Sequence, residues 1–266
     1  MEGTSVLWCH DGGASMHRDL DVDAAIEGAA EKVRRSLKEG RLPTGARPVV
    51  FTPAALSAIL AALHSAVGAP AVYRKTSPLT GRLGDKVLNR KVTILDDSRP
   101  EAGRAGSPFD DEGLPAFAMP IVEDGVLKNF IADLRFAARL DLRPGRGRRA
   151  GYSTAPFPAA GNWEMAAGTV PLPELLAKAE GGLLVDSLLG MHGSNLANGD
   201  FSANVGLGFA IGPGGELQYR VKDAVIAGNF YQLLGERLAD LSTDRRRGYS
   251  GSELFPWVLC ADVPVT

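Results

Sequence analysis

The sequence predicts an α+β fold in which a large, mostly antiparallel β-sheet packs against a few helices. Short apolar runs typical of strands follow one another without regular alternation with helical segments, which argues against a parallel sheet. The 32 glycines and 17 prolines are spread along the chain as turn residues instead of gathering in one tract. With 266 residues, 45% of them apolar, the chain is long enough to bury a sizeable core.

Composition excludes several classes of protein. The net charge is −2, from 29 basic and 31 acidic residues, so bulk charge recruits neither nucleic acid nor an anionic membrane. The first residues lack the basic region and the apolar run typical of a signal peptide, and nowhere do about 18 apolar residues follow one another. Cys9 and Cys260 lie far apart, unlike a disulfide framework, and the apolar run around Cys260 should raise the pKa of its thiol. Both cysteines are interpreted as structural, and we expect a cytoplasmic protein.

Residues 1–20 form an irregular leader, and residues 21–266 form one domain that is helical to about residue 70 and rich in strands after it. Apolar residues at helical spacing, with Asp21, Thr52 and Asp133 as candidate caps, predict the helices. These helices are expected over 24–38, 54–67, 134–140, 173–179 and 229–241. Short apolar runs between turn residues predict strands over 48–51, 91–95, 116–122, 126–130, 183–185, 201–211, 217–221 and 257–260.

The helix over 54–67 carries His64 close to its end. Helices with the pattern His-Glu-x-x-His, or a form one residue longer, hold zinc with two imidazoles while the glutamate activates water. Here Ser65 follows the histidine, and Ala69 stands where the second imidazole of the longer form would be. Serine is no general base at neutral pH without a base of its own, and alanine binds no metal. The chain is therefore not predicted to be a self-sufficient zinc peptidase.

Three further polar segments are candidates for function. The acidic cluster 110–113 could bind a cation, although such clusters are more typical of solvated turns or backbone caps. The basic segment 143–149, in a stretch with the composition of a mobile loop, could hold a phosphate or a peptide carboxylate, but such segments are commonly solvated. Segment 190–202 places an imidazole, amides and a carboxylate around tight turns, which suits either an extended peptide backbone or a simple change of chain direction.

Taken in order, several of these segments resemble the TldD/PmbA family, the modulators of gyrase that are related to metallopeptidases. The similarity extends from about Asp19 to the C-terminus. The usual N-terminal domain is largely missing, so the chain is expected to be a truncated or naturally short form. The matching segments are Lys91-Val-Thr-Ile-Leu-Asp-Asp97, Phe109-Asp-Asp-Glu-Gly-Leu-Pro115, Glu123-Asp-Gly-Val-Leu-Lys128, Leu189-Gly-Met-His192, Asn198-Gly-Asp-Phe-Ser202 and Val225-Ile-Ala-Gly-Asn-Phe230.

The resemblance also indicates which type of family member this is. Catalytic members are His-Glu-x-x-x-His zinc peptidases with a cysteine as third ligand, whereas PmbA or TldE-like members lack these ligands. His64 aligns with the first ligand, Ser65 with the glutamate and Ala69 with the second histidine, and the segment around 190–200 contains no cysteine. The resemblance therefore implies a vacated zinc helix and no catalytic or metal-binding residue in this chain.

The main hypothesis is a non-catalytic, TldE-like subunit that forms a dimer with a zinc-bearing, TldD-like partner and helps it bind and cleave unfolded peptides. His192, Asn195 and Asp200 are the candidate substrate-binding residues, and zinc is expected only in the partner. Two alternatives stay open. One is an active metalloprotease with a rearranged metal site built from His64, His192 and the acidic cluster. The other is a homodimeric peptide-binding or scaffold protein.

Overall fold

The structure, a computed structural model, describes residues 9–12, 21–191, 198–248 and 250–266. Its helices are α1 Val22–Ser36, α2 Pro53–Ala66, α3 Ala69–Tyr73, α4 Leu134–Leu140, α5 Leu172–Lys178 and α6 Phe230–Leu233. Its strands are β1 Glu39–Gly40, β2 Gly45–Phe51, β3 Ile94–Asp97, β4 Ala118–Glu123, β5 Val126–Leu127, β6 Gly147–Arg148, β7 Phe157–Pro158, β8 Asn162–Met165, β9 Leu183–Leu189, β10 Asp200–Ile211, β11 Leu217–Val221, β12 Val225–Asn229, β13 Leu238–Arg247 and β14 Glu253–Val265.

Twelve of these strands join one sheet, in the order β1-β11-β10-β9-β2-β14-β8-β3-β4-β5, with β12 beside β10 and β14, and β13 beside β14. The strands β10, β9, β2, β14 and β12 close a ring, since each pairs with the next, and form a small barrel. Most pairings are antiparallel, and the exceptions are β1 with β11, β2 with β9 and β8 with β14. The predicted α+β fold with a large, mostly antiparallel sheet is confirmed.

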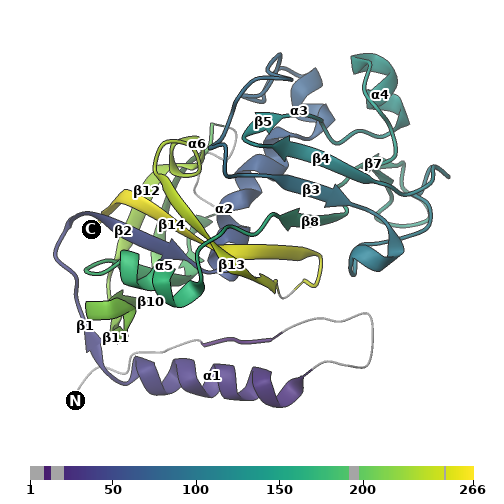
Figure 1. The fold of residues 1–266 in the computed structure, drawn as a ribbon. Helices are drawn as coiled ribbons and strands as arrows, with labels where there is room; N and C mark the ends of the chain where they lie inside the picture. Colours follow the sequence, from purple (N-terminus) through teal and green to yellow (C-terminus); the bar gives the residue numbers. More distant parts are fainter. Residues whose placement is uncertain (1–8, 13–20, 192–197, 249) are drawn as a thin grey trace.

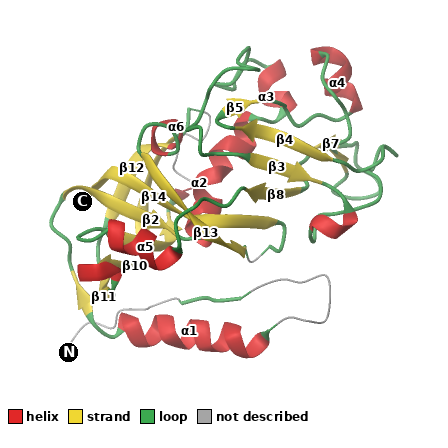
Figure 2. Cartoon of the chain, in the orientation of Figure 1, coloured by secondary structure: helices red, strands yellow, loops and turns green. Residues whose placement is uncertain are grey.

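Figure 1 shows the sheet as two lobes, the barrel strands in one and β3, β4 and β8 in the other, with α2 behind the junction between them. The remaining helices lie on the outside, as the red segments of Figure 2 show, and α1 runs below the barrel. The helix α2 is predominantly buried, and its apolar side chains pack into the main core together with residues of both lobes, such as Val258 and Ile94. Its position is therefore determined by packing on several sides.

Local signals placed several elements correctly. Asp21, Thr52 and Asp133 cap α1, α2 and α4 by accepting hydrogen bonds from the backbone N–H groups of Ala24, Ala55 and Phe136. The hairpin of β4 and β5 turns at Asp124-Gly125, whose φ values of 49° and 78° are those of a type I′ turn. A Cβ atom on Gly125 would approach the Leu88 carbonyl oxygen to 2.4 Å. Both the positive φ and the lack of space therefore require glycine at this position.

Other predictions were wrong. Residues 229–241 do not form one helix: the short α6 ends at Leu233, and Leu238 begins β13, which pairs with β14. The strand expected over 91–95 is β3, displaced to Ile94–Asp97, so Asp96 and Asp97 lie within the strand instead of following it. The strands β8 and β12 were not predicted.

The apolar stripe of α1 faces solvent over much of its length. Ile26 is 63% exposed, Val33 45% and Leu37 81%. Polar contacts hold the helix to the rest of the chain, notably Lys32, which pairs with Asp186 of β9 at 3.0 Å. Helical periodicity in this segment therefore predicted the helix but not a buried face.

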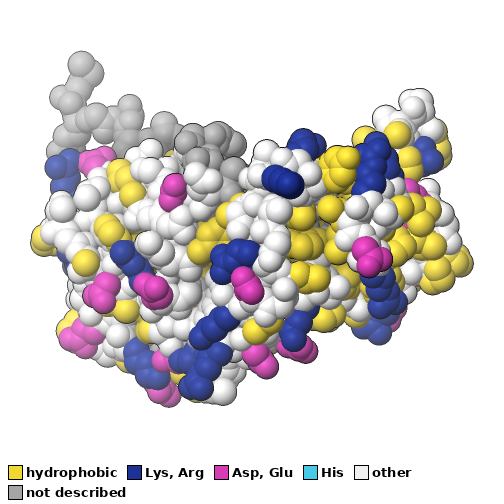
Figure 3. Space-filling view, turned by 90° about the horizontal axis from the view of Figure 1, so that it is seen from above, with side chains coloured by type: hydrophobic (Ala, Val, Ile, Leu, Met, Phe, Trp, Pro, Cys, Tyr) yellow, Lys and Arg dark blue, Asp and Glu magenta, His cyan; other side chains and the backbone are white. Residues whose placement is uncertain are grey.

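The face seen from above carries a mixed surface over α3 and α4, where hydrophobic side chains lie among Lys and Arg (Figure 3). Tyr73 is 47% exposed, and Leu134 is 44% exposed. The Arg139 guanidinium lies 5.1 Å from the centre of the Tyr73 ring, and Arg135 lies 4.6 Å from that of Phe136. Cation–π contacts of this kind let aromatic rings remain partly exposed beside charge.

None of the described helices combines the length and the apolar character needed to cross a membrane.

Candidate functional site

The helix α2 holds His64 in its last turn, beside the buried strand β8. The imidazole stacks on the indole of Trp163, with ring centres 3.6 Å apart and planes 26° apart. Its Nε2 atom is buried and has no hydrogen-bond partner in the described part of the chain. Burial lowers the pKa of His64 to about 4, because a charged imidazolium would lose its hydration there. At neutral pH His64 is therefore an uncharged, stacked side chain.

The structure does not bring His64, Ser65 and Ala69 together on one helix. The helix α2 ends at Ala66, and Gly68 is the N-cap of the separate helix α3, which begins at Ala69. Ser65 is exposed. Ala69 is fully buried in a small cluster with Ala132, Phe136 and Ala137. A zinc ion held by two imidazoles of one continuous helix does not fit this geometry, and the side chains themselves offer neither base nor second ligand.

Other metal ligands do not gather elsewhere in the described residues. There, no three His, Cys, Asp or Glu side chains lie close enough to hold a metal ion. Cys260 is fully buried, its thiol donates a hydrogen bond of 3.4 Å to the Leu233 carbonyl, and burial raises the pKa of that thiol. Cys9 is a free, partly exposed thiol. The described His, Cys, Asp and Glu side chains thus do not form a zinc centre.

The acidic cluster 110–113 is a set of backbone caps, the alternative that the sequence analysis favoured. The Asp110 carboxylate accepts hydrogen bonds from the N–H groups of Glu112, Leu114 and Gly147, at 2.9 to 3.0 Å. Glu112 accepts one from the N–H of Leu134, at the start of α4. These oxygens are occupied in fixing the loop against its neighbours.

The basic segment 143–149 contains a residue that is not solvated, so its description as a mobile, solvated loop was wrong for Arg146. That side chain is 1% exposed and its Nε donates to Asp96 at 2.9 Å, while the Asp96 side chain is 0% exposed. Asp96 also accepts from the indole N–H of Trp163 and the N–H of Gly161. This ion pair was not predicted, because its members are 50 residues apart in the sequence.

Of the three candidate substrate-binding residues, His192 and Asn195 lie outside the described residues. Asp200 is exposed at the start of β10. Its carboxylate accepts a hydrogen bond of 2.8 Å from the side-chain amide of Asn229, which also donates to the Asn198 carbonyl at 3.0 Å. Asp200 therefore has a defined position at the start of β10.

A cavity of about 210 Å³ lies at the opposite end of α2 from His64. Its lining includes Thr52, the cap of α2, with Leu184 and Asp186 of β9, Lys32 of α1 and Trp257 of β14. No spacing in the sequence indicates this cavity, because its walls come from segments far apart along the chain.

Comparison with known proteins identifies one family. Residues 44–266 match the model of the PmbA/TldA metallopeptidase C-terminal domain. Over 204 residues, the chain is 30% identical to Metalloprotease PmbA of Escherichia coli O157:H7, covering 77% of this chain and 43% of that protein. It is 32% identical over 216 residues to the Metalloprotease PmbA homolog of Haemophilus influenzae, covering 80% and 45%. The chain thus spans about half the length of the curated relatives it matches.

Solved structures agree with this assignment. The crystal structure of TldE from Thermococcus kodakarensis superposes with a TM-score of 0.87 at 26% identity, covering 96% of this chain and 57% of that one. A putative modulator of a DNA gyrase from Thermotoga maritima gives a TM-score of 0.81 at 30% identity, covering 93% and 56%. The same fold therefore occurs as one part of longer chains.

Proposed function

Because the chain belongs to the PmbA/TldD metallopeptidase family, we propose that it is a non-catalytic subunit of the TldE type. It pairs with a zinc-bearing relative and helps that relative to hold and cleave unfolded peptides. The single observation that supports the proposal is that the three vacated zinc-helix positions offer neither a general base nor a pair of metal ligands. His64 is stacked and uncharged, Ser65 stands in place of a base, and Ala69 belongs to a different helix.

Peptide binding is assigned in this proposal to the segment around the start of β10. Exposed strand ends and turns can hold an extended peptide through backbone hydrogen bonds, with little dependence on peptide sequence. Asp200, fixed by Asn229, is one contributing residue. His192 and Asn195 are the other two.

The decisive experiment mixes the purified chain with a family relative that carries the intact His-Glu-x-x-x-His motif. We expect a heteromeric complex by light scattering after size-exclusion chromatography, and faster cleavage of an unstructured peptide than by the relative alone. The absence of both a complex and a gain in cleavage would rule the proposal out. A mass equal to twice that of the chain, with the relative eluting separately, would instead indicate the homodimeric scaffold.

Metal analysis separates the proposal from an active enzyme with a rearranged metal site. That alternative needs His64, His192 and the acidic cluster together, whereas the Asp110 carboxylate already accepts three backbone hydrogen bonds. We expect far less than one zinc per chain after purification and no change on His64→Ala. One zinc per chain, lost in His64→Ala, would establish the alternative.

A further inference from the structure

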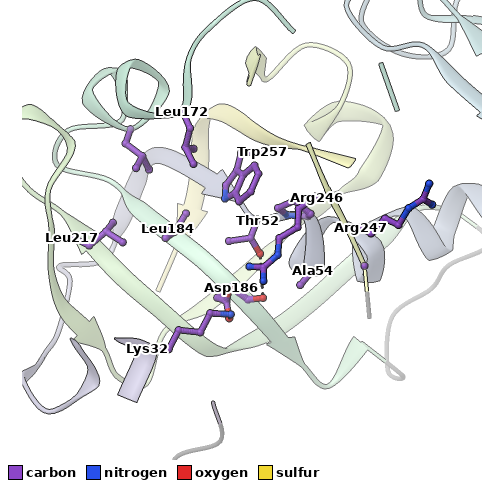
Figure 4. Close-up of a pocket in the computed structure, with 13 residues that line it drawn as sticks. Lys32, Thr52, Ala54, Leu172, Leu184, Asp186, Leu217, Arg246, Arg247 and Trp257 are labelled. Atoms are coloured by element: carbon purple, nitrogen blue, oxygen red, sulfur yellow. Dashed lines mark hydrogen bonds and ion pairs between the residues drawn. The ribbon is translucent and has the colours of Figure 1, made fainter. Parts of the chain in front are cut away.

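The cavity at the start of α2 has apolar walls. Leucine side chains come from α5, β9 and β11, and the indole of Trp257 comes from β14, so four elements converge on one space. Figure 4 shows Leu172, Leu184 and Leu217 on one side of the space and Trp257 beside them. The apolar lining residues are Pro53, Ala54, Leu172, Leu176, Leu184, Leu217 and Trp257.

Charged side chains at the polar end of the cavity neutralise one another. Lys32 pairs with Asp186 at 3.0 Å and with Asp11 at 3.5 Å, and Arg246 pairs with Asp11 as well. The guanidinium of Arg247 donates to the backbone carbonyls of Ala102 and Gly251. The signs alternate along this chain of contacts, so the buried part of a ligand should be apolar and uncharged.

The volume restricts the size of the group that fits. An apolar cavity of about 150 Å³ is large enough for benzene, and pockets for drug-sized ligands start at about 300 Å³. A cavity of about 210 Å³ lies between these limits. It suits one aromatic ring or one branched aliphatic group.

A second hollow continues the cavity along β9. It has a volume of about 290 Å³, shares Ala54 and Asp186 with the cavity, and extends past Ser187 to Leu189. The pairing of β9 with β2 ends at Val185, and among the described residues no other strand takes that edge of 186–189. The Asp186 carbonyl accepts a hydrogen bond from the Thr52 hydroxyl, and His10 lines one side of the hollow. An extended main chain can therefore follow β9 away from the cavity along 187–189.

We propose that the cavity binds one phenyl- or isobutyl-sized side chain of an extended peptide whose main chain lies along residues 187–189 of β9. The identification of this peptide as a substrate rests on the function proposed above, whereas the binding itself does not. The cavity begins at Thr52, and His64 lies 12 residues further along the chain, about 18 Å at the rise of an α-helix. The site therefore lies at the other end of α2 from the vacated position at His64.

The test measures binding to the purified chain without any partner. The probes are two blocked pentapeptides, Ac-Ala-Ala-Phe-Ala-Ala-NH2 and the all-alanine analogue, with p-cresol as a free aromatic molecule. We expect a dissociation constant on the order of 1 mM for the phenylalanine peptide. Because burial of the ring is the main favourable contribution, we expect at least tenfold weaker binding of the alanine peptide. Calorimetry and the intrinsic tryptophan fluorescence, to which Trp257 contributes, can both follow the titration of the peptides.

A matched pair of variants on α2 locates the site. Ala54→Leu fills the cavity from its wall, whereas Ala61→Leu makes the same change two turns further along the same helix face. We expect Ala54→Leu to weaken binding of the phenylalanine peptide at least tenfold. Ala61→Leu should change the dissociation constant of this peptide less than twofold. Leu217→Trp, which fills the cavity from β11, replaces Ala54→Leu if that variant unfolds. Thermal melting of each variant verifies that it is folded.

The outcomes are separable. Equal affinities for the two peptides, or unchanged binding by the cavity-filling variants, overturn the proposal. Binding of p-cresol without the phenylalanine peptide also overturns it, because the occupant would then be a free small molecule. If the mixing experiment restores proteolysis but the peptides do not bind this cavity, the proposed function stands and this inference fails. If the phenylalanine peptide binds this cavity but no catalytic complex forms, this inference stands and the proposed function fails.

Discussion

Replacing Arg146 with methionine tests the interpretation that a buried ion pair stabilises the lobe of the sheet that contains β3, β4 and β8. Methionine retains much of the volume and the apolar stem but removes the guanidinium. In the native chain this group donates to the Asp96 carboxylate and to the carbonyl oxygens of Gly145, Asp96 and Phe117. The substitution leaves the Asp96 carboxylate without its counter-ion in the interior.

The magnitude follows from burial. Both side chains are almost inaccessible, at 1% and 0% exposure. Removing one partner of such a pair typically lowers the free energy of unfolding by about 3 to 5 kcal/mol, because the remaining charge stays buried. A domain stability of about 5 to 15 kcal/mol means that this loss is a large part of the total. The hydrogen bonds from Trp163 and Gly161 remain and limit the effect.

Urea unfolding followed by circular dichroism measures the change. The control is Arg149→Met, in the same basic segment, where the side chain is exposed and donates to the Thr154 carbonyl. We expect the control to stay within about 0.5 kcal/mol of the native chain. A loss below about 1 kcal/mol for Arg146→Met, or equal losses in both variants, would show that the pair contributes little.

The pH dependence of the same variant provides an independent check. Burial raises the pKa of Asp96, and Arg146 opposes that rise in the native chain. Without Arg146 the folded variant takes up a proton on Asp96 more readily than the unfolded chain does. Unfolding then releases that proton, so the stability of the variant relative to the native chain falls as the pH rises. We expect the loss of stability to be smaller at pH 5 than at pH 8.

Three further predictions follow from single groups. Because the pKa of His64 is lowered to about 4, the unfolded chain binds the proton more readily, and stability should fall by up to about 3 kcal/mol as the pH falls from 6.5 to 4. His64→Gln should remove most of this slope in unfolding titrations. A thiol reagent should modify Cys9 rapidly and Cys260 only after denaturation, with mass spectrometry identifying the site. Asp133→Ala should lower the unfolding free energy by about 1 kcal/mol, because the N–H of Phe136 loses its cap; no change in the melting curve would contradict this.

The parts of the fold that could be predicted are those set by local chemistry. A cap followed by an apolar periodic segment determined α2 and α4, and an Asp-Gly turn determined the hairpin at Gly125. The prediction of a helix over 229–241 was wrong because the apolar spacing of this segment suits both a helix and a buried strand. Gly235 follows the short α6, and pairing with β14, from Leu238 onward, decides in favour of a strand. That pairing depends on residues about 20 positions away, which periodicity does not register.

The candidate site divides in the same way. That Ser65 and Ala69 cannot serve as base and ligand is a property of their side chains and could be stated from the sequence. The end of α2 at Ala66 could not be predicted from the sequence. It shows that the backbone, as well as the side chains, departs from a continuous zinc helix. The burial of Arg146 depends on Asp96, and the cavity depends on five or more separate segments. Spacing arguments fail for both, because tertiary packing creates the environment.

The two ends of α2 should act independently. The helix is packed on several sides, so a change at one end is absorbed locally unless it moves the whole helix. Ala54 and His64 are ten residues apart, about 15 Å along the axis, and substitutions at such a distance without shared partners usually add in free energy. The variant Ala54→Leu should therefore weaken peptide binding equally in the native and His64→Gln backgrounds. A coupled response would mean that the stacked imidazole and the cavity report on one movement of α2, and that the helix transmits changes between them.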